Sequence, residues 1–291
     1  MPAPTLSPKP VFLDGGAWHT DLVRTYGLRF DVNCSILFTE LPLLERPAAA
    51  KAAGFDGVEF WWPFDEPVPG DKEADAFAAA IADAGVELVS LNFLTGDIAA
   101  GERGLLSVPR ATAEFRQNIT AAVELAARVG CTRLNAPYGN RLDPADARLA
   151  REQDDLAIEN LRLAADAAAT VGATVLVEPI NSVDLPLFPI DTSAKAAAVI
   201  EKSRRVNIRM LADLYHLAMM SEDLSDTLSR YAPLIGHVQV ADVPGRGAPG
   251  TGTLDFEPLF AQLTELGYPG GIGLEFIPND MTDSSTSFGW L

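Results

Sequence analysis

Residues 172–181 read GATVLVEPIN, a short apolar run that starts after Gly172 and ends in the carboxylate of Glu178. Three later segments have the same design: NIRMLAD at 207–213, GHVQVAD at 236–242 and IGLEF at 272–276. A run of about four to eight apolar residues bounded by turn-forming residues is typical of a strand buried on both faces of a parallel sheet. The polar residue at or near the end of each run is therefore out of place in a core and needs a reason.

Such runs alternate with longer helical segments along most of the chain. We predict strands at Leu28–Asn33, Asp56–Phe60, Glu87–Asn92, Thr132–Ala136, Thr174–Glu178, Asn207–Asp213, Gly236–Val240 and Ile272–Phe276. The segments between them predict helices over Pro47–Ala53, Lys72–Ala84, Thr112–Val129, Gln153–Val171, Asp191–Lys202, Asp223–Tyr231 and Phe256–Leu266. Strands that alternate with helices form βαβ units and a parallel sheet.

The number and order of these units predict a closed (β/α)₈ TIM barrel. Its main rival is a doubly wound open sheet, which usually carries a glycine-rich phosphate loop after an early strand. No G-x-G-x-x-G follows the first predicted strand, and the chain has no Walker A sequence. We therefore predict one catalytic barrel domain over residues 28–291, preceded by an extension over residues 1–27 that is rich in proline and glycine.

Composition excludes several classes of partner. The chain has 291 residues, with 40 acidic against 22 basic side chains and a formal charge of −18. Nucleic acids and anionic membranes both require basic surface, so neither is expected as a partner. The N-terminus lacks the basic start and apolar stretch of a signal peptide, and only two cysteines, Cys34 and Cys131, occur in the chain. We expect a soluble cytoplasmic protein that acts on a small molecule and assembles as a homo-oligomer.

The chemistry is expected where the barrel strands end. The carboxyl ends of the strands in such a barrel converge on one mouth, where the active site lies. The side chains placed there by the last four predicted strands are Glu178, Asp213, Gln239 and Glu275. Three carboxylates at one mouth repel one another, and a divalent cation removes that repulsion. Oxygen ligands favour Mg²⁺ or Mn²⁺. The alternative is that each acid pairs with a nearby arginine or lysine.

Two glutamates beside a divalent cation indicate a type of reaction. The cation would bind the two oxygens of an α-hydroxy carbonyl compound and stabilise the enediolate that forms when the adjacent C–H bond is broken. One glutamate would take the proton and another group would return one to the neighbouring carbon. This is aldose–ketose isomerisation, or epimerisation if the proton returns to the same carbon on its other face.

The motifs resemble those of the hydroxypyruvate isomerase family, within the xylose-isomerase-like TIM barrels. The matching segments are GVEF at 57–60, GDIAAGERG at 96–104, EPIN at 178–181, DLYH at 213–216, GHVQVAD at 236–242, PGTG at 249–252 and GLEF at 273–276. They run in order from about Leu28 to Phe276, and the AAGERG segment is the most distinctive. The chain departs from the family pattern at Ile98, where tryptophan is usual, at Thr253, where glutamate is usual, and at the bulky pair Trp61 and Trp62.

The resemblance implies roles for named residues. The implied metal ligands are Glu178, Asp213, Gln239 and Glu275, and the implied acid/base pair is Glu178 and Glu275. The implied substrate contacts are His216, Arg246, Glu59, Glu102 and Arg103. His237 lies two residues before Gln239 and so faces the same side of its strand; we expect it to be packed lower in the barrel.

The resemblance also implies an intramolecular oxidoreductase that interconverts hydroxypyruvate and tartronate semialdehyde. A 2-oxo-tetronate isomerase, a ketose 3-epimerase and a barrel that binds sugar acids without turning them over remain as alternatives. Endonucleases with several zinc ions occur in the same superfamily, but three histidines and a charge of −18 suit neither such a site nor DNA.

Overall fold

The strands close into a single parallel barrel. A computed structural model of the chain describes residues 27–291, and in it each strand pairs with the next along the chain and the last pairs with the first. The strands are β1 (Arg29–Asn33), β2 (Gly57–Phe60), β3 (Glu87–Asn92), β4 (Arg133–Asn135), β5 (Thr174–Val177), β6 (Ile208–Asp213), β7 (Ile235–Val240) and β8 (Gly271–Leu274). The predicted (β/α)₈ barrel is therefore confirmed, and every predicted strand is found.

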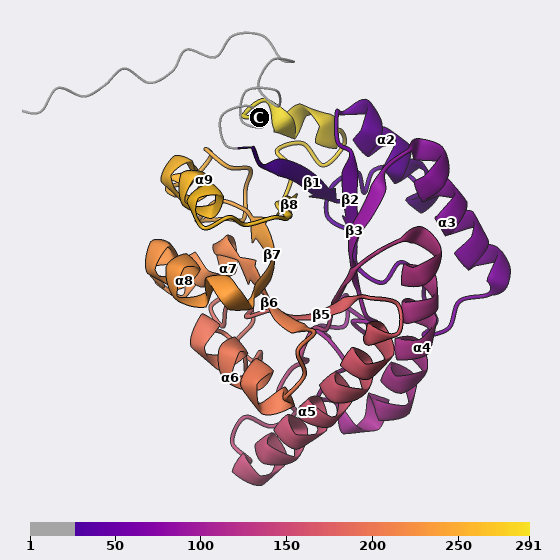
Figure 1. The fold of residues 1–291 in the computed structure, drawn as a ribbon, viewed down its shortest axis with the longest axis vertical. Coiled ribbons are helices and arrows are strands. Elements are labelled where there is room, and N and C mark those ends of the chain that lie inside the picture. Colours follow the sequence, from indigo (N-terminus) through magenta and orange to yellow (C-terminus); the bar gives the residue numbers. More distant parts are fainter. Residues whose placement is uncertain (1–26) are drawn as a thin grey trace, which may run out of the picture.

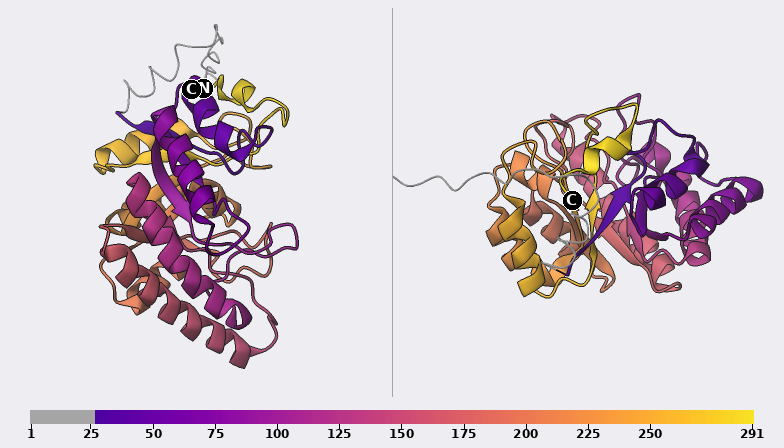
Figure 2. Two further views of the ribbon diagram at one scale, coloured as in Figure 1. Left: turned by 90° about the vertical axis from the view of Figure 1, so that its right-hand side faces the viewer. Right: turned by 90° about the horizontal axis from the view of Figure 1, so that it is seen from above.

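Helices surround the ring of strands on its outside (Figure 1). They are α2 (Arg46–Ala52), α3 (Asp71–Ala84), α4 (Thr112–Val129), α5 (Ala147–Ala169), α6 (Ser193–Ser203), α7 (Leu214–Met219), α8 (Leu224–Tyr231) and α9 (Phe256–Glu265). Short 3₁₀ helices occur at η1 (Leu43–Glu45), η2 (Pro109–Ala111), η3 (Ala232–Leu234) and η4 (Ser284–Phe288). The two side views in Figure 2 show the long helices α3, α4 and α5 packed side by side against the barrel.

Two helices differ from the prediction because capping side chains set their ends. Helix α5 begins at Ala147 rather than near Gln153, because the carboxylate of Asp146 accepts hydrogen bonds from the backbone N–H groups of Arg148 and Leu149. Helix α7 was not predicted. It is only six residues long and begins directly after β6, where the side chain of Asp213 accepts a hydrogen bond from the backbone N–H of Tyr215.

The C-terminal segment packs against the start of the barrel. Ser284 in η4 donates its hydroxyl to Glu40 and accepts a hydrogen bond from the backbone N–H of Phe38. The ring of Phe288 packs edge-on against Phe55 at a centroid distance of 4.8 Å. The end of the chain thus belongs to the same core as β1, as Figure 2 also shows.

Nearly all of the predicted N-terminal extension lies outside the described residues. No helix within residues 27–291 combines the length and the apolar character that crossing a membrane requires.

Candidate active site

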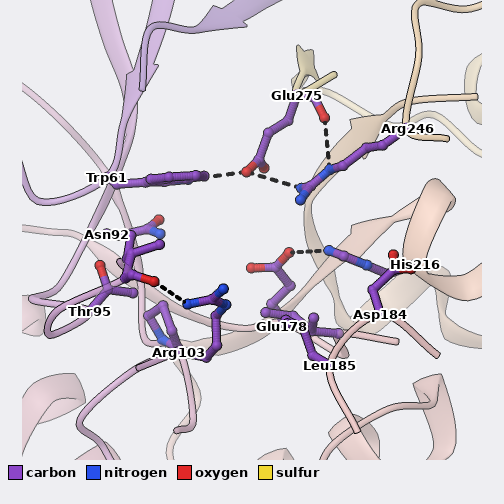
Figure 3. A pocket seen from close by; sticks show the side chains of 13 residues that line it. Trp61, Asn92, Thr95, Arg103, Glu178, Asp184, Leu185, His216, Arg246 and Glu275 are labelled. Atoms are coloured by element: carbon purple, nitrogen blue, oxygen red, sulfur yellow. Dashed lines mark hydrogen bonds and ion pairs between the residues drawn. The ribbon is translucent and has the colours of Figure 1, made fainter. Parts of the chain in front are cut away.

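A cavity of about 220 Å³ opens at the carboxyl ends of the strands. Its lining residues are Trp61, Asn92, Thr95, Ile98, Arg103, Pro137, Glu178, Ile180, Asp184, Leu185, His216, Arg246 and Glu275. Figure 3 shows the carboxylates of Glu178 and Glu275 pointing into it from different strands, with the guanidinium of Arg246 near both.

The barrel register brings the predicted ligands together. Glu178 directly follows β5, and Glu275 directly follows β8. Asp213 ends β6 and lies opposite Gln239 of β7, and both side chains are buried. Because parallel strands end at the same level, these four residues lie at the same end of the barrel.

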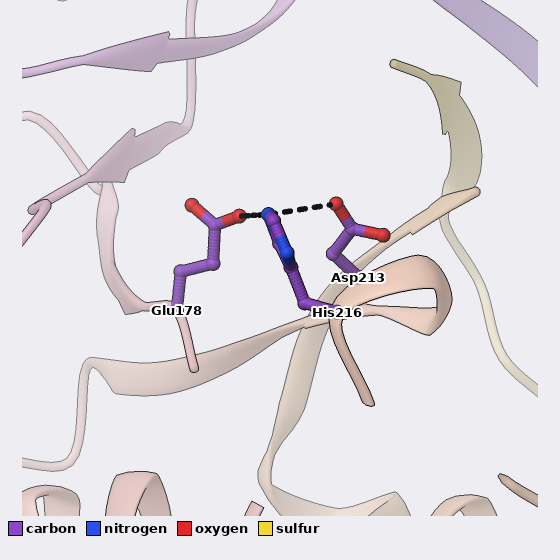
Figure 4. A group of neighbouring side chains, drawn as sticks. All are labelled: Glu178, Asp213 and His216. Atoms are coloured by element: carbon purple, nitrogen blue, oxygen red, sulfur yellow. Dashed lines mark ion pairs between the residues drawn. The ribbon is translucent and has the colours of Figure 1, made fainter. Parts of the chain in front are cut away.

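Glu178, Asp213 and His216 form a compact cluster of buried side chains whose polar atoms lie close together. One ligand atom of each lies within 4.8 Å of those of the other two. The Nε2 atom of His216 lies 3.8 Å from Oε1 of Glu178 and 3.6 Å from Oδ2 of Asp213. Figure 4 shows the imidazole of His216 between the two carboxylates. Burial, with a further contribution from Arg246, lowers the pKa of His216 well below its usual value. The imidazole in this cluster is therefore neutral.

Asn181 decides which nitrogen of His216 carries the proton. The Oδ1 atom of Asn181 accepts the backbone N–H of Asp184 at 2.7 Å, so its amide NH₂ must point the other way, toward Nδ1 of His216 at 2.7 Å. Nδ1 is therefore an acceptor, and the proton lies on Nε2. A protonated Nε2 cannot ligate a metal. We conclude that His216 offers a hydrogen-bond donor to the cavity.

Burial, together with repulsion from neighbouring acids, raises the pKa of both glutamates. Burial raises the pKa of Glu178 well above its usual value, and the nearby Glu275 and Asp213 add to the effect. Burial likewise raises the pKa of Glu275 to about 7. Asn135 donates to Oε2 of Glu178 at 2.8 Å, and the indole N–H of Trp61 donates to Oε1 of Glu275 at 3.1 Å. Groups held in this way can exchange protons near neutral pH.

Arg246 supplies positive charge among these acids. Its Nη2 atom lies 3.2 Å from Oε1 of Glu275 and 3.6 Å from Oδ2 of Asp213. Burial alone would lower the pKa of this guanidinium, but Glu275, Asp213 and Glu178 raise it above its usual value. The guanidinium also lies over the ring of Tyr215, 5.5 Å from the ring centroid.

The residues present fit a divalent cation. Within the described part of the chain, Oδ2 of Asp213 and Oε1 of Gln239 are buried oxygen atoms without a hydrogen-bond partner. Leaving such an atom unpaired in a protein interior is costly. Together with the carboxylates of Glu178 and Glu275, these atoms form a donor set made entirely of oxygen, which hard cations such as Mg²⁺ and Mn²⁺ favour.

Glu59 does not line the mouth, and the expectation that it contacts substrate is corrected. Its side chain is 1% exposed inside the barrel. One carboxylate oxygen lies 2.5 Å from Nε2 of His237, and the other accepts the side-chain amide of Gln239 at 2.6 Å. The prediction that His237 is packed lower in the barrel is confirmed, because this side chain is fully buried.

Glycines on neighbouring strands leave space for two buried acids, Glu59 and Asp31. A Cβ atom added at Gly273 would lie 2.2 Å from Oε1 of Glu59. Added at Gly57 or Gly271, it would lie 2.0 or 1.9 Å from a carboxyl oxygen of Asp31. We call the set Asp31, Glu59, His237 and Gln239 the polar floor of the barrel.

The loop after β3 divides its predicted residues between two roles. Arg103 lines the cavity and donates to the backbone oxygens of Ile98 and Glu102. Glu102 is not among the cavity-lining residues. It accepts the backbone N–H of Asp97 and pairs with Arg110, so it braces the loop. It also lines an adjoining hollow that shares Trp61, Thr95 and Ile98 with the cavity, so its predicted contact with substrate stays a prediction.

Three asparagines belong to the site but were not predicted. Asn92 and Asn135 end β3 and β4, and Asn181 follows β5. Asn92 and Asn135 are polar residues at the ends of apolar strands, as Glu178 is, so the sequence signal that marks acids there also marks these amides. Asn181 gives no such signal, because its role depends on a histidine far away in the sequence.

Comparisons with known proteins agree with this geometry. Residues 47–291 match the family described as Xylose isomerase-like TIM barrel. A Streptomyces coelicolor protein with the provisional name hydroxypyruvate isomerase is 51% identical over 269 residues, which are 90% of this chain and 95% of that protein. The 2-oxo-tetronate isomerase of Cupriavidus necator is 39% identical over 264 residues, covering 90% of this chain and 97% of the relative.

A solved structure matches as well. The crystal structure of a Brucella melitensis protein named AP endonuclease, family 2, is 35% identical, with a TM-score of 0.82, and covers 90% of this chain and 97% of that one. The agreement in sequence extends over nearly the whole barrel and includes relatives named as isomerases. The chain therefore belongs to the xylose isomerase-like TIM barrels and, within them, to the hydroxypyruvate isomerase family, and it is an isomerase.

Proposed function

We propose that the protein is a metal-dependent isomerase that interconverts hydroxypyruvate and tartronate semialdehyde. One observation carries the proposal: two buried glutamates, Glu178 and Glu275, face a small cavity beside two buried oxygens that lack hydrogen-bond partners, Oδ2 of Asp213 and Oε1 of Gln239. A sugar-acid binding protein would have no need of two buried carboxyl groups with raised pKa values.

The residues that would hold a divalent cation, Mg²⁺ or Mn²⁺, are Glu178, Asp213, Gln239 and Glu275. A cation held there supplies electrostatic stabilisation for the negative charge that develops on the substrate oxygens. The remaining work falls to the side chains of the chain itself.

Glu178 and Glu275 move the protons. In hydroxypyruvate, one of them removes a proton from C3 and the other delivers a proton to C2, while the hydroxyl proton on C3 passes to the oxygen on C2. The C3–H bond breaks and a C2–H bond forms, so the ketone becomes an aldehyde without any external oxidant. The Nε2–H group of His216 donates a hydrogen bond to a substrate oxygen during this exchange.

The cavity suits a short acid. Arg103 and Arg246 line it, and a guanidinium can bind a carboxylate through two parallel hydrogen bonds. Ile98, Ile180 and Leu185 supply apolar walls that leave little room for a long polyhydroxylated chain. A 2-oxo-tetronate, one carbon longer, is the second candidate, because the Cupriavidus necator relative bears that name. We infer a small-molecule substrate, a cytoplasmic location and a homo-oligomer, with no nucleic-acid or membrane partner.

The test is an NMR assay in D₂O with Mg²⁺ added to the purified protein. We expect hydroxypyruvate to react and to exchange its C3 hydrogen for deuterium, because a base removes that hydrogen. Glu275→Gln should lower the rate by at least about 100-fold, since a general acid or base contributes a factor of this size.

The matched control is Glu265→Gln, at an exposed glutamate near the end of α9, which should leave the rate unchanged. Turnover of a 2-oxo-tetronate alone would keep the mechanism and change the substrate. No turnover and no exchange with any α-hydroxy carbonyl acid would contradict the proposal.

A further inference from the structure

The amide of Gln239 has a hydrogen-bond partner at one end and none at the other. Its nitrogen donates to Oε2 of Glu59 at 2.6 Å, whereas its Oε1 is buried without a partner among the described residues. Gln239 is 3% exposed and Glu59 is 1% exposed, so water competes little for either group.

Glu59 is in turn held so that it faces the amide as an acceptor. Its other oxygen, Oε1, lies 2.5 Å from Nε2 of His237. A carboxylate only accepts hydrogen bonds, so both its neighbours must be donors. The amide of Gln239 therefore has to present its NH₂ to Glu59, and its carbonyl oxygen must point away.

We infer that Glu59 is a positioning residue, which forces the carbonyl oxygen of Gln239 to face the ligand set. The inference rests on the proposed metal centre and goes beyond it, because Glu59 itself contacts neither metal nor substrate. An amide is nearly symmetric in shape, so packing alone does not distinguish its oxygen from its nitrogen. With the opposite orientation, an NH₂ group would point at a cation and could not bind it.

The neighbouring strand β8 leaves space for this arrangement through a glycine. Gly273, opposite Gln239 in the β7–β8 register, leaves the space that Glu59 and Gln239 occupy, because a Cβ there would lie 2.2 Å from Oε1 of Glu59 and 2.8 Å from Cγ of Gln239. The pair is thus fixed by its neighbours on both sides. Partners that orient a ligand typically change metal affinity by about 10- to 100-fold when they are mutated.

The experiment measures Mn²⁺ binding to the full-length protein by calorimetry and by the EPR signal of free Mn²⁺. In Glu59→Gln, the new side chain keeps its oxygen on His237 and turns its NH₂ toward Gln239, which must then flip. We expect the Kd for Mn²⁺ to rise about 10- to 100-fold.

In the exchanged double variant, Glu59→Gln with Gln239→Glu, the NH₂ group of residue 59 donates to one oxygen of residue 239, and the other oxygen of residue 239 faces the ligands. This variant exchanges the carboxylate of residue 59 with the amide of residue 239, so the total charge of the pair is unchanged. We expect it to recover most of the lost affinity for Mn²⁺. Asp31→Asn is the matched control, since it removes a buried acid from the same polar floor whose carboxyl lies against Gly57 and Gly271. It should change the Kd by less than about threefold.

A measurement without metal complements these variants. The chain has four glutamines, so ¹⁵N-glutamine labelling gives few side-chain amide signals. One proton of the Gln239 amide should be strongly shifted downfield in the wild type, because it donates to a carboxylate. An unshifted signal overturns the inference even if Glu59→Gln fails to fold.

The outcomes separate the two proposals. If the wild type binds Mn²⁺ and Glu59→Gln binds it equally well, the inference about Glu59 is wrong and the metal centre stands. If the exchanged double variant binds as poorly as the single variant, orientation is not the cause and the inference is again wrong. If the wild type binds neither Mn²⁺ nor Mg²⁺, the proposed metal centre itself is wrong.

Discussion

His216 takes part in this site through one proton, and Asn181 places that proton. The orientation of Asn181 is fixed because its oxygen accepts a backbone N–H, which leaves only its NH₂ for Nδ1 of His216. The histidine is thereby a donor at Nε2, 3.6 to 3.8 Å from the two nearest carboxylates. An asparagine that touches no substrate can in this way determine what a histidine does.

The Asn181→Asp variant tests this assignment. An aspartate accepts hydrogen bonds, so it would draw the proton of His216 to Nδ1 and leave a lone pair on Nε2. We expect kcat to fall by about 100-fold, the size of a lost proton donor. The ¹⁵N chemical shifts of the imidazole should exchange their tautomer pattern. Unchanged shifts combined with unchanged kcat would show that Asn181 has no such role.

At the scale of elements, the loop between β7 and α9 is organised around one carboxylate. Asp242 accepts backbone N–H groups from Val243 and Leu254 on one oxygen, and from Gly250 and Gly252 on the other. The loop so held carries Arg246, whose backbone oxygen accepts the N–H of residue 277 at 2.7 Å. The position of the guanidinium in the site thus depends on a residue four positions earlier.

The Asp242→Asn variant should disturb this loop without changing its size. One oxygen becomes an NH₂ group that faces two backbone donors, which leaves buried groups unpaired. We expect kcat/KM for the acid to fall by about 10- to 100-fold as Arg246 loses its place, together with a lower Tm. Asp255→Asn, at an exposed residue that makes no side-chain cap, is the control and should match the wild type. Equal kinetics in both variants would argue against this role for the loop.

The elements themselves were largely predictable from the sequence. Each strand is an apolar run bounded by turn residues, so all were found within one or two positions. Helix α7 was not predicted, because six residues are too few to show a helical periodicity in the sequence. Its start also depends on the N-cap made by Asp213. The positions of Glu178 and Glu275 were predictable because a carboxylate that follows an apolar strand is conspicuous in the sequence. Asn135 also ends a strand, so its position is visible in the sequence, but its contact with Glu178 is not.

At the scale of the whole molecule, the barrel has buried acidic side chains not only at its mouth but also deeper inside, where Asp31 and Glu59 lie. The pKa of Asp31 is raised to about 7, chiefly by burial and in addition by the neighbouring Glu59. Asp31 lies on β1, and its carboxyl reaches the space beside Gly57 of β2 and Gly271 of β8. Because one side chain lies between three strands, its charge state affects the stability of the closed barrel.

The pH dependence of stability follows with a definite sign. The folded chain holds the proton of Asp31 more tightly than the unfolded chain does, so the stabilising contribution is complete below about pH 4 and is lost as the pH rises toward 7. Asp31→Asn cannot ionise. From pH 4 to pH 8 it should therefore gain stability relative to the wild type, by a free energy of unfolding on the order of 4 kcal/mol.

Urea unfolding of both proteins in EDTA at several pH values measures this difference. Asp31→Leu serves as a second variant, because it also removes the titrating group but keeps no polar atoms. Parallel curves of unfolding free energy against pH for Asp31→Asn and the wild type would show that the pKa of Asp31 does not differ between the folded and the unfolded chain. The closed barrel was predicted from the order of strands, but this buried acid was not singled out, because nothing in the sequence shows that glycines on two other strands face it.

The glycines that face Asp31 and Glu59 couple the substitutions that these positions of the barrel can tolerate. A mutation of Gly57, Gly271 or Gly273 to alanine would drive a methyl group into Asp31 or Glu59. Replacing either acid by a smaller side chain would leave a gap, because glycine has no side chain that could fill it. A larger residue at one of these glycines is therefore compatible with the fold only after the facing acid has become smaller, so the order of substitutions is constrained. The buried acids can therefore stay in the barrel only as long as the positions that face them remain without side chains.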